Sequence, residues 1–295
     1  MGFRAFQPLI WSVVAAGVVA CSNRAPEGAG DVVDDLGRHV ALRGPATRVV
    51  SLSPATTELL FAIGAGNRVV GRTHWDKYPP AVTDIPSVGD GLDPNIETVV
   101  DRRPDLVVFY ASNANTLAIQ RLADIGIASV SLRLDSLASV PRGARLLGRL
   151  THRVASADSL AQAFEAQRDS ARGSPHPASN VRVVILAWDN PPIIIGAQSF
   201  LSELLDLAGA ENVFRDVDAP SAPVTIETIA ERDPDLILFF ADEAPAFTRR
   251  PEWQTVDAVR NRRFVFVQGS EFEYPSPRAF QAAQTLRRAL MEATR

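Results

Sequence analysis

Aromatic and acidic side chains gather in the segments that directly follow predicted buried strands. In parallel α/β folds, ligands bind outside the carboxyl ends of the strands. Aromatic rings there would offer a broad apolar surface to a flat ligand, and carboxylates would accept hydrogen bonds from it. For each tryptophan, packing in the protein interior is the alternative. The candidate ligand-binding residues are Trp75, Tyr78, Tyr110, Trp188, Asp189, Asp242, Glu271, Phe272 and Tyr274.

His74 is the one histidine in these segments. A neutral imidazole can bind cobalt or iron, so His74 is a possible axial ligand to a metal carried by the ligand. The alternative is an ordinary polar or solvated side chain. The other histidines lie elsewhere in the sequence, so we expect neither a resident metal site nor a cofactor.

The sequence lacks the motifs that are typical of several classes of function. Gly64-Ala65-Gly66 ends a predicted helix instead of following a strand, so it is not a dinucleotide fingerprint. The sequence has no Walker A run, no Gly-x-Ser-x-Gly elbow and no paired metal-binding histidines. Net charge is −4 and the arginines are scattered, which argues against nucleic acid as the partner. We expect no enzyme; catalysis in an α/β cleft is the distant alternative.

Residues 1–20 have the pattern of a secretory signal. One charge, Arg4, precedes an apolar run that is too short to span a bilayer comfortably. The only cysteine, Cys21, follows at once, and Val18-Val19-Ala20-Cys21 resembles a bacterial lipobox, in which the cysteine is acylated. We therefore expect an exported, membrane-anchored lipoprotein with a lipidated tether over residues 21–34. The alternative is an ordinary signal peptide beside an incidental cysteine.

Strand and helix patterns alternate in two separate parts of the chain. Predicted strands cover 48–52, 69–71, 106–110 and 128–132, and then 181–186, 236–240 and 264–267. Predicted helices cover 57–63, 114–125, 136–150, 156–172 and 276–292. This alternation predicts an α/β fold with parallel sheets. We expect an N-terminal α/β lobe at 35–135, a helical connection at 136–178 and a C-terminal α/β lobe at 179–295.

An internal repeat supports the division into two lobes. Residues 96–111 match residues 226–241 at a constant offset of 130 positions, without a gap. Each copy reads as a short helix, a Pro-Asp turn and a buried strand. Two copies at this distance predict two similar lobes and not a solenoid, which needs at least three shorter units.

Motifs in a fixed order identify a family resemblance. These are the segment 48–58, Tyr78-Pro79-Pro80, the two Pro-Asp-Leu repeats, the segment 209–214 and Ser276-Pro277-Arg278. Together they resemble the solute-binding proteins of ABC importers for cobalamin, iron siderophores and haem. The resemblance implies two Rossmann-like lobes joined by one long helix, at 156–172, with a rigid hinge. It also implies a monomer that delivers its ligand to a permease dimer with ATPase subunits.

The repeat places one glutamate on each lobe, Glu97 and Glu227. In the relatives, one glutamate per lobe docks on permease arginines, and a pseudo-symmetric charge pair suits a two-fold symmetric partner. The alternative is a structural role, because an acidic residue in the first turn favours the helix dipole. Asn95 and Thr225 are the expected N-caps.

The ligand is expected to be a corrinoid, with cobalamin first. Trp75-Asp76-Lys77-Tyr78-Pro79-Pro80 and Asn190-Pro191-Pro192 are nearer to the cobalamin binders than to the siderophore binders. An acidic cleft would disfavour a negatively charged ferric siderophore. The loops 89–92 and 219–223 lack tryptophans that the cobalamin-binding relative has there. An iron siderophore or haem is therefore the alternative ligand.

Overall fold

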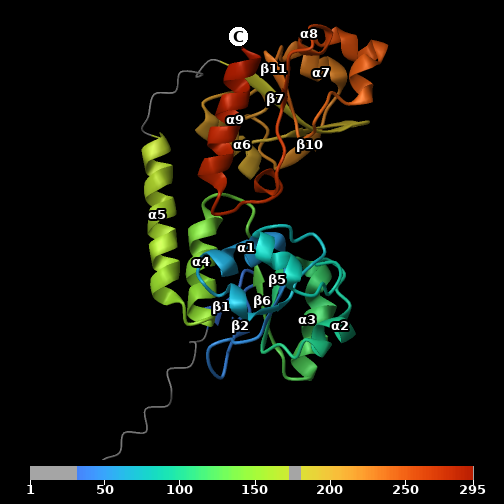
Figure 1. Ribbon diagram of the computed structural model, residues 1–295. Coiled ribbons are helices and arrows are strands. Elements are labelled where there is room, and N and C mark those ends of the chain that lie inside the picture. The colour runs from blue at the N-terminus through green and yellow to red at the C-terminus, as the bar shows by residue number, and fades with distance from the viewer. Residues whose placement is uncertain (1–31, 173–180, 295) are drawn as a thin grey trace, which may run out of the picture.

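The computed structural model describes residues 32–172 and 181–294 (Figure 1). The expected signal segment and Cys21 lie outside these residues. Two α/β lobes, one built mainly from blue to green segments and one from yellow to red, lie one above the other, and a long helix runs along one side (Figure 1). The predicted fold class of two lobes joined by one long helix is confirmed.

The N-terminal lobe is built on four parallel strands in the order β4-β3-β5-β6. Short runs of β-branched and aliphatic residues form these strands and bury them almost completely. Crossover helices return the chain between the strands, as parallel pairing requires. The elements are β3 (Val49–Leu52), α1 (Pro54–Ala62), β4 (Val69–Gly71), α2 (Ile96–Asp101), β5 (Leu106–Tyr110), α3 (Thr116–Asp124) and β6 (Ala128–Leu132).

The C-terminal lobe has a mixed sheet. Strands β7, β11 and β12 are parallel, β9 adds to β7, and β8 and β10 pair antiparallel at the other edge. The antiparallel strands β8 and β10 were not predicted from the sequence. The elements are β7 (Arg182–Asp189), β8 (Pro192–Ile195), α6 (Phe200–Ala208), β9 (Glu211–Asn212), β10 (Ser221–Pro223), α7 (Ile226–Glu231), β11 (Leu236–Phe239), α8 (Asp257–Arg260), β12 (Phe264–Phe266) and α9 (Ala279–Ala293).

The two lobes repeat the same local structure around the sequence repeat. Helices α2 and α7 are capped by the side chains of Asn95 and Thr225, as predicted, which accept from the backbone N–H of Thr98 and Thr228. A left-handed residue follows the C-cap of each helix, at φ 48° for Arg103 and φ 44° for Asp233. The aspartates of the two Pro-Asp turns then accept a backbone N–H at the start of a buried strand, that of Arg48 just before β3 or that of Arg182, the first residue of β7.

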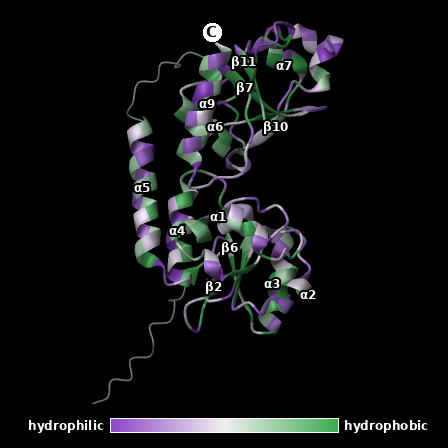
Figure 2. Cartoon of the chain, viewed as in Figure 1, coloured by the Kyte–Doolittle hydropathy of each residue, from purple (hydrophilic) through white to green (hydrophobic). Residues whose placement is uncertain are grey.

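Two helices form the connection, α4 (Ser139–Leu150) and α5 (Val154–Arg172). Helix α5 begins two residues before the predicted start and packs along α4, where Arg145 makes a bidentate ion pair with Glu165. Phe164 of α5 packs edge-on against Phe280 of α9, with ring centroids 4.9 Å apart. The apolar side chains of the strands and the inner helix faces form the core, and the strands of both sheets are coloured mainly as hydrophobic residues (Figure 2). The connection thus shares its core with both lobes.

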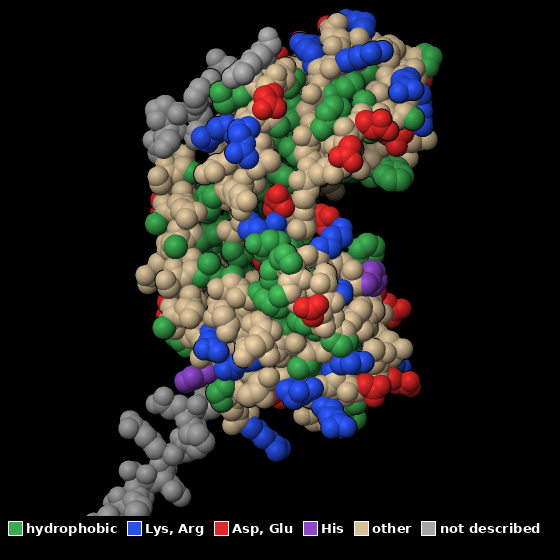
Figure 3. All heavy atoms as spheres, viewed as in Figure 1, with side chains coloured by type: hydrophobic (Ala, Val, Ile, Leu, Met, Phe, Trp, Pro, Cys, Tyr) green, Lys and Arg blue, Asp and Glu red, His purple; other side chains and the backbone are tan. Residues whose placement is uncertain are grey.

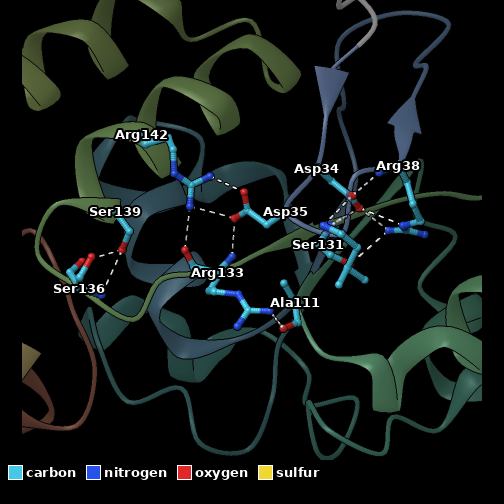
Figure 4. Close-up of polar contacts among 10 residues, drawn as sticks. Asp34, Asp35, Arg38, Ala111, Ser131, Arg133, Ser136, Ser139 and Arg142 are labelled. Carbon is cyan, nitrogen blue, oxygen red and sulfur yellow. Dashed lines mark hydrogen bonds and ion pairs between the residues drawn. The ribbon is translucent and has the colours of Figure 1, made fainter. Parts of the chain in front are cut away.

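A polar cluster fixes the first hairpin, β1 (Val32–Val33) and β2 (His39–Val40), to the N-terminal lobe (Figure 4). The buried carboxylate of Asp34 accepts from Nε and Nη2 of Arg38 and from the backbone N–H of Ser131 in β6. Asp35 accepts from Arg142 of α4 and from the backbone N–H of Arg133. The chain therefore enters this lobe at the edge strand of its sheet.

Short 3₁₀ turns complete the connections. They are η1 (Gly66–Arg68), η2 (Pro80–Asp84), η3 (Asn113–Asn115), η4 (Ala246–Arg249), η5 (Pro251–Thr255) and η6 (Ser270–Phe272). The turn η6 follows β12 and leads into α9, so it lies beyond the carboxyl edge of the C-terminal sheet.

Candidate functional site

The carboxyl ends of the parallel strands of the two lobes face each other. Lys77, in the segment after β4, makes an ion pair with Glu273, in the segment after β12, with 3.2 Å between Nζ and Oε1. Tyr78 stacks against Arg278 of the other lobe. The surface is deeply hollowed between the lobes, on the side opposite the connecting helix (Figure 3). This hollow is where ligands are expected to bind in open parallel sheets.

The segment after β4 holds Trp75 at the surface. Its side chain is 53 % exposed, and its Nε1 donates to Asp90 Oδ2 over 3.3 Å. His74 lies against it, with ring centroids 4.4 Å apart, and its Nδ1 is 3.1 Å from the carbonyl oxygen of Gly89. The indole N–H is thus satisfied within the protein, and the indole ring stays accessible.

Trp188 is held in a similar way in the other lobe. It lies near the end of β7, where the pairing with β8 is irregular, and 60 % of it is exposed. Its Nε1 donates to the carbonyl oxygen of Asn190 over 3.0 Å. Both tryptophans therefore have their polar atom bound locally and a large apolar surface exposed.

The repeat brings another pair of aromatic residues to the ends of the central strands. Tyr110 ends β5, and its hydroxyl donates to Asp135 Oδ1 over 2.9 Å. Burial, together with the carboxylate of Asp135, raises the pKa of Tyr110. Phe240 takes the equivalent place after β11 and is 37 % exposed. Sequence reasoning missed Phe240, although it lies 130 positions after Tyr110 and the repeat itself pointed to it.

Two aromatic candidates lie deeper. Phe272 is buried, and its ring packs 6.0 Å from that of Phe240. Tyr274 is partly buried, and burial followed by the negative charge of Glu58 raises the pKa of its hydroxyl. Both rings therefore support the surface residues around them more than they add apolar surface of their own.

Arginines compensate part of the acidic charge of the candidates. Asp189 lies 3.3 Å from Nη1 of Arg250, and Glu271 lies 2.8 Å from Nη1 of Arg278. Arg278 also pairs with Glu58, so its one positive charge serves two carboxylates, and Asp242 is exposed after β11. The rim therefore keeps a net negative charge that is smaller than its carboxylates alone would give. The sequence could not show this compensation, because the basic partner of Asp189 is distant in the sequence.

A buried ion pair joins the lobes below these side chains. Arg278, just before α9, donates from Nε and Nη2 to the two carboxylate oxygens of Glu58 in α1, each over 2.8 Å. Glu58 is in the segment 48–58 and Arg278 in Ser276-Pro277-Arg278, so both belong to motifs noted in the sequence. The two residues are 220 positions apart, and nothing in the sequence indicated that they pair.

The carboxyl group of Asp76 lies under the Trp75 segment. It is buried, and its Oδ2 accepts the backbone N–H of Thr73 over 2.6 Å. Desolvation by burial raises the pKa of Asp76 to about 6, although the hydrogen bond from Thr73 opposes this shift. The folded protein therefore binds this proton more tightly than the unfolded chain does.

The docking candidates lie at the start of the repeat helices. Glu97 and Glu227 are both exposed in the first turns of α2 and α7. The hydrogen bond from its own backbone N–H, followed by that from Thr225, lowers the pKa of Glu227. Asn95 and Thr225 supply the N-caps, and each glutamate adds a negative charge to the first turn, where it favours the helix dipole. Helices α2 and α7 lie on the side of the molecule away from α5 (Figure 1).

Within residues 32–172 and 181–294, no group of three or more histidine, cysteine, aspartate or glutamate side chains is placed to hold a metal ion. The described part of the chain also contains no helix that is both long and apolar enough to cross a membrane.

The buried Asp76 predicts a specific dependence of stability on pH. Between about pH 4 and 6 the folded state holds a proton that the unfolded state has lost, so this residue destabilises the fold as the pH rises through about 6. Asp76→Asn should therefore stabilise the protein relative to wild type at pH 7 and not at pH 4, by about 3 kcal/mol at most. Urea unfolding at pH 4, 5, 6 and 7 measures the difference. The exposed Asp84→Asn is the control, and a difference that does not change with pH would contradict the assignment.

Comparison with known proteins gives a consistent result. The family described as "Periplasmic binding protein" matches residues 49–270. The vitamin B12-binding protein of Pectobacterium carotovorum is 27 % identical over 242 residues, which cover 81 % of this chain and 86 % of that protein. An uncharacterized ABC transporter substrate-binding lipoprotein of Bacillus subtilis, YvrC, is 28 % identical over 263 residues, which cover 86 % of this chain and 83 % of that protein.

A solved structure agrees with these relatives. The structure of a possible iron-binding periplasmic solute-binding protein of Staphylococcus epidermidis matches with a TM-score of 0.72 and 25 % identity, over 83 % of this chain and 98 % of that one. The family match covers most of the chain, including both lobes and the connection between them. The chain therefore belongs to the periplasmic binding protein family, whose members are solute-binding proteins of transport systems and not enzymes.

Proposed function

We propose that the protein is an exported lipoprotein that captures a corrinoid, with cobalamin first, between its lobes and delivers it to an ABC permease. The observation that carries this proposal is the pair of exposed tryptophans, Trp75 and Trp188, one at the carboxyl edge of each sheet. Ligand sites in clefts are lined mainly by hydrophobic and aromatic side chains. Because each indole N–H is bound within the protein, the rings are free to pack against a flat macrocycle.

The charge of the rim supports a ligand that is not an anion. Arg250 and Arg278 are paired with carboxylates, Arg278 with both Glu58 and Glu271, so the cleft lacks the strong positive field that a polyanionic ferric siderophore would favour. Carboxylate and carbonyl oxygens in such a rim can accept hydrogen bonds from the amide groups around a corrinoid. The relative named as a vitamin B12-binding protein supports the same ligand class.

Haem or a ferric siderophore is the alternative ligand, and His74 is the observation that favours haem. When Nδ1 of His74 donates to the carbonyl oxygen of Gly89, Nε2 keeps its lone pair. That nitrogen belongs to an exposed side chain beside Trp75. An iron or cobalt atom in a ligand stacked on Trp75 would then have an axial donor within the same segment.

If the two exposed tryptophans contact the ligand, replacing either of them should weaken ligand binding. Trp75→Ala and Trp188→Ala should each weaken cyanocobalamin binding by about 10- to 100-fold, the usual cost of losing a central aromatic contact. Ile125→Ala is the control, because Ile125 is an exposed apolar residue that follows the last turn of α3, at the opposite end of that helix from the carboxyl end of β5. Calorimetric titration with cyanocobalamin, haemin and a ferric siderophore measures all three ligands. Binding of a ferric ligand without any binding of cyanocobalamin would overturn the corrinoid.

We propose that Glu97 and Glu227 dock on the permease. Charge reversal at both residues should reduce ligand uptake at least tenfold with the cognate permease in proteoliposomes, because complementary charges set the register of docking. Ligand affinity in solution should change less than twofold. The paired reversals Asp101→Arg and Glu231→Arg, at exposed positions at the ends of the same helices, are the matched control. Uptake that survives the reversal of Glu97 and Glu227 would contradict this role.

We also propose that the mature chain begins at Cys21 and is acylated there. Two or more acyl chains hold a protein at a membrane far more firmly than one. Cys21→Ser should release the protein from the membrane fraction or leave it unprocessed, while ligand binding is unchanged. Intact-mass measurement of the native protein should find a lipid-sized increment on a chain that starts at Cys21. An unmodified mature chain that starts at another residue would exclude the anchor.

A further inference from the structure

Arg278 contacts both lobes at once. Besides its two bonds to Glu58 of α1, its Nη1 donates to Glu271 Oε2 over 2.8 Å and its Nη2 to Ser270 Oγ over 3.0 Å. Its guanidinium carbon lies 3.8 Å from the ring centroid of Tyr78. One side chain of the C-terminal lobe is therefore held by an acid and an aromatic ring of the N-terminal lobe and by the η6 turn of its own lobe.

The geometry of this contact is restrictive. A planar guanidinium that bonds both oxygens of a carboxylate tolerates little rotation. The pair is also shielded from water, with the side chain of Glu58 3 % exposed and that of Arg278 13 % exposed. A buried pair of this kind adds little net stability compared with apolar residues of the same volume, and its better-supported role is to select one arrangement among several.

Other contacts that link the lobes, directly or through the connection, are less directional. The Lys77–Glu273 pair is about half exposed on both sides, so it is weak and adapts to movement. The rings of Phe164 and Phe280 belong to an apolar contact, which resists separation but permits sliding. Leu137 N–H donates to Glu203 Oε1 over 3.1 Å, which is one ordinary hydrogen bond at the connection.

The residues that Arg278 holds belong to the candidate cleft. Tyr78 has one face against the guanidinium, and the residue is partly exposed. Glu271 is fixed by the same guanidinium in η6, beside Phe272. Loss of the guanidinium would therefore free a cleft residue in each lobe and leave the buried carboxylate of Glu58 without its basic partner.

We propose that Arg278 is a positioning residue that sets the spacing of the two lobes and aligns Tyr78 and Glu271 across the cleft. The role in lobe spacing is argued from the contacts of Arg278 in the ligand-free protein. A second effect, slower dissociation of the bound ligand, rests on the proposed function.

The test measures the distance between the lobes in ligand-free protein. Spin labels at Asp101→Cys and Glu231→Cys, exposed and equivalent positions of α2 and α7, report it by pulsed dipolar spectroscopy in a Cys21→Ser background that leaves no other thiol. Arg278→Met should broaden the distance distribution at least twofold, and Arg278→Lys should give an intermediate width. Arg38→Met is the matched control, because Arg38 also donates from Nε and Nη2 to a buried carboxylate, that of Asp34, but within one lobe.

The expected result is a broadened distribution for Arg278→Met and Glu58→Gln and a native width for the control. In the same variants, the ligand selected by calorimetry should dissociate at least tenfold faster. If Arg278→Met folds and keeps the wild-type width, the proposal is wrong. If Arg278→Met does not fold, the widths of the distance distributions of Arg278→Lys and Glu58→Gln are compared with the wild-type width instead. A protein that binds none of the three ligands would refute the proposed function, while the distance measurement would still test Arg278.

Discussion

The carboxylate of Glu58 and the guanidinium of Arg278 meet in a water-shielded pair that spans the two lobes, and the shape of the cleft depends on it. Each lobe can build its own sheet from buried strands, but nothing in a sheet determines how it faces the other lobe. The shared apolar core around α4, α5 and α9 brings the lobes together through contacts that are not directional. A bidentate pair supplies direction, because both partners must keep one orientation to keep both bonds.

Two copies of one local structure then determine what is brought together. The N-caps, the left-handed turns and the aspartate bonds recur in both lobes, so α2 and α7 begin in the same way and β5 and β11 follow the same turn. This near-symmetry places Glu97 and Glu227 in equivalent exposed positions and Tyr110 and Phe240 at equivalent strand ends. One duplicated motif thus provides both a pair of surface charges and a pair of aromatic side chains at the strand ends.

Much of this was predictable from local sequence, because burial and periodicity are local signals. The strands β4, β5 and β6 have the predicted bounds, since short β-branched runs between turns leave little choice. Trp75 lies exposed in the loop predicted for it, whereas Trp188, expected in a loop after residue 186, is exposed within β7, which continues to Asp189. Charge compensation was not predictable, because Asp189 and Arg250, or Glu58 and Arg278, are far apart in sequence and meet only through the fold. For the same reason the sequence did not separate the exposed Trp188 from the buried Phe272.

The central claim is that one ligand is held by both lobes at the carboxyl edges of their sheets. Hydrogen–deuterium exchange of the intact protein, with and without saturating cyanocobalamin, tests it directly because the ligand should slow the opening of every segment that it contacts. The account predicts slower exchange in residues 72–78 of one lobe and in residues 187–190 and 269–274 of the other, with helices α2 and α7 unchanged. Protection confined to a single lobe, or located away from these segments, would contradict it.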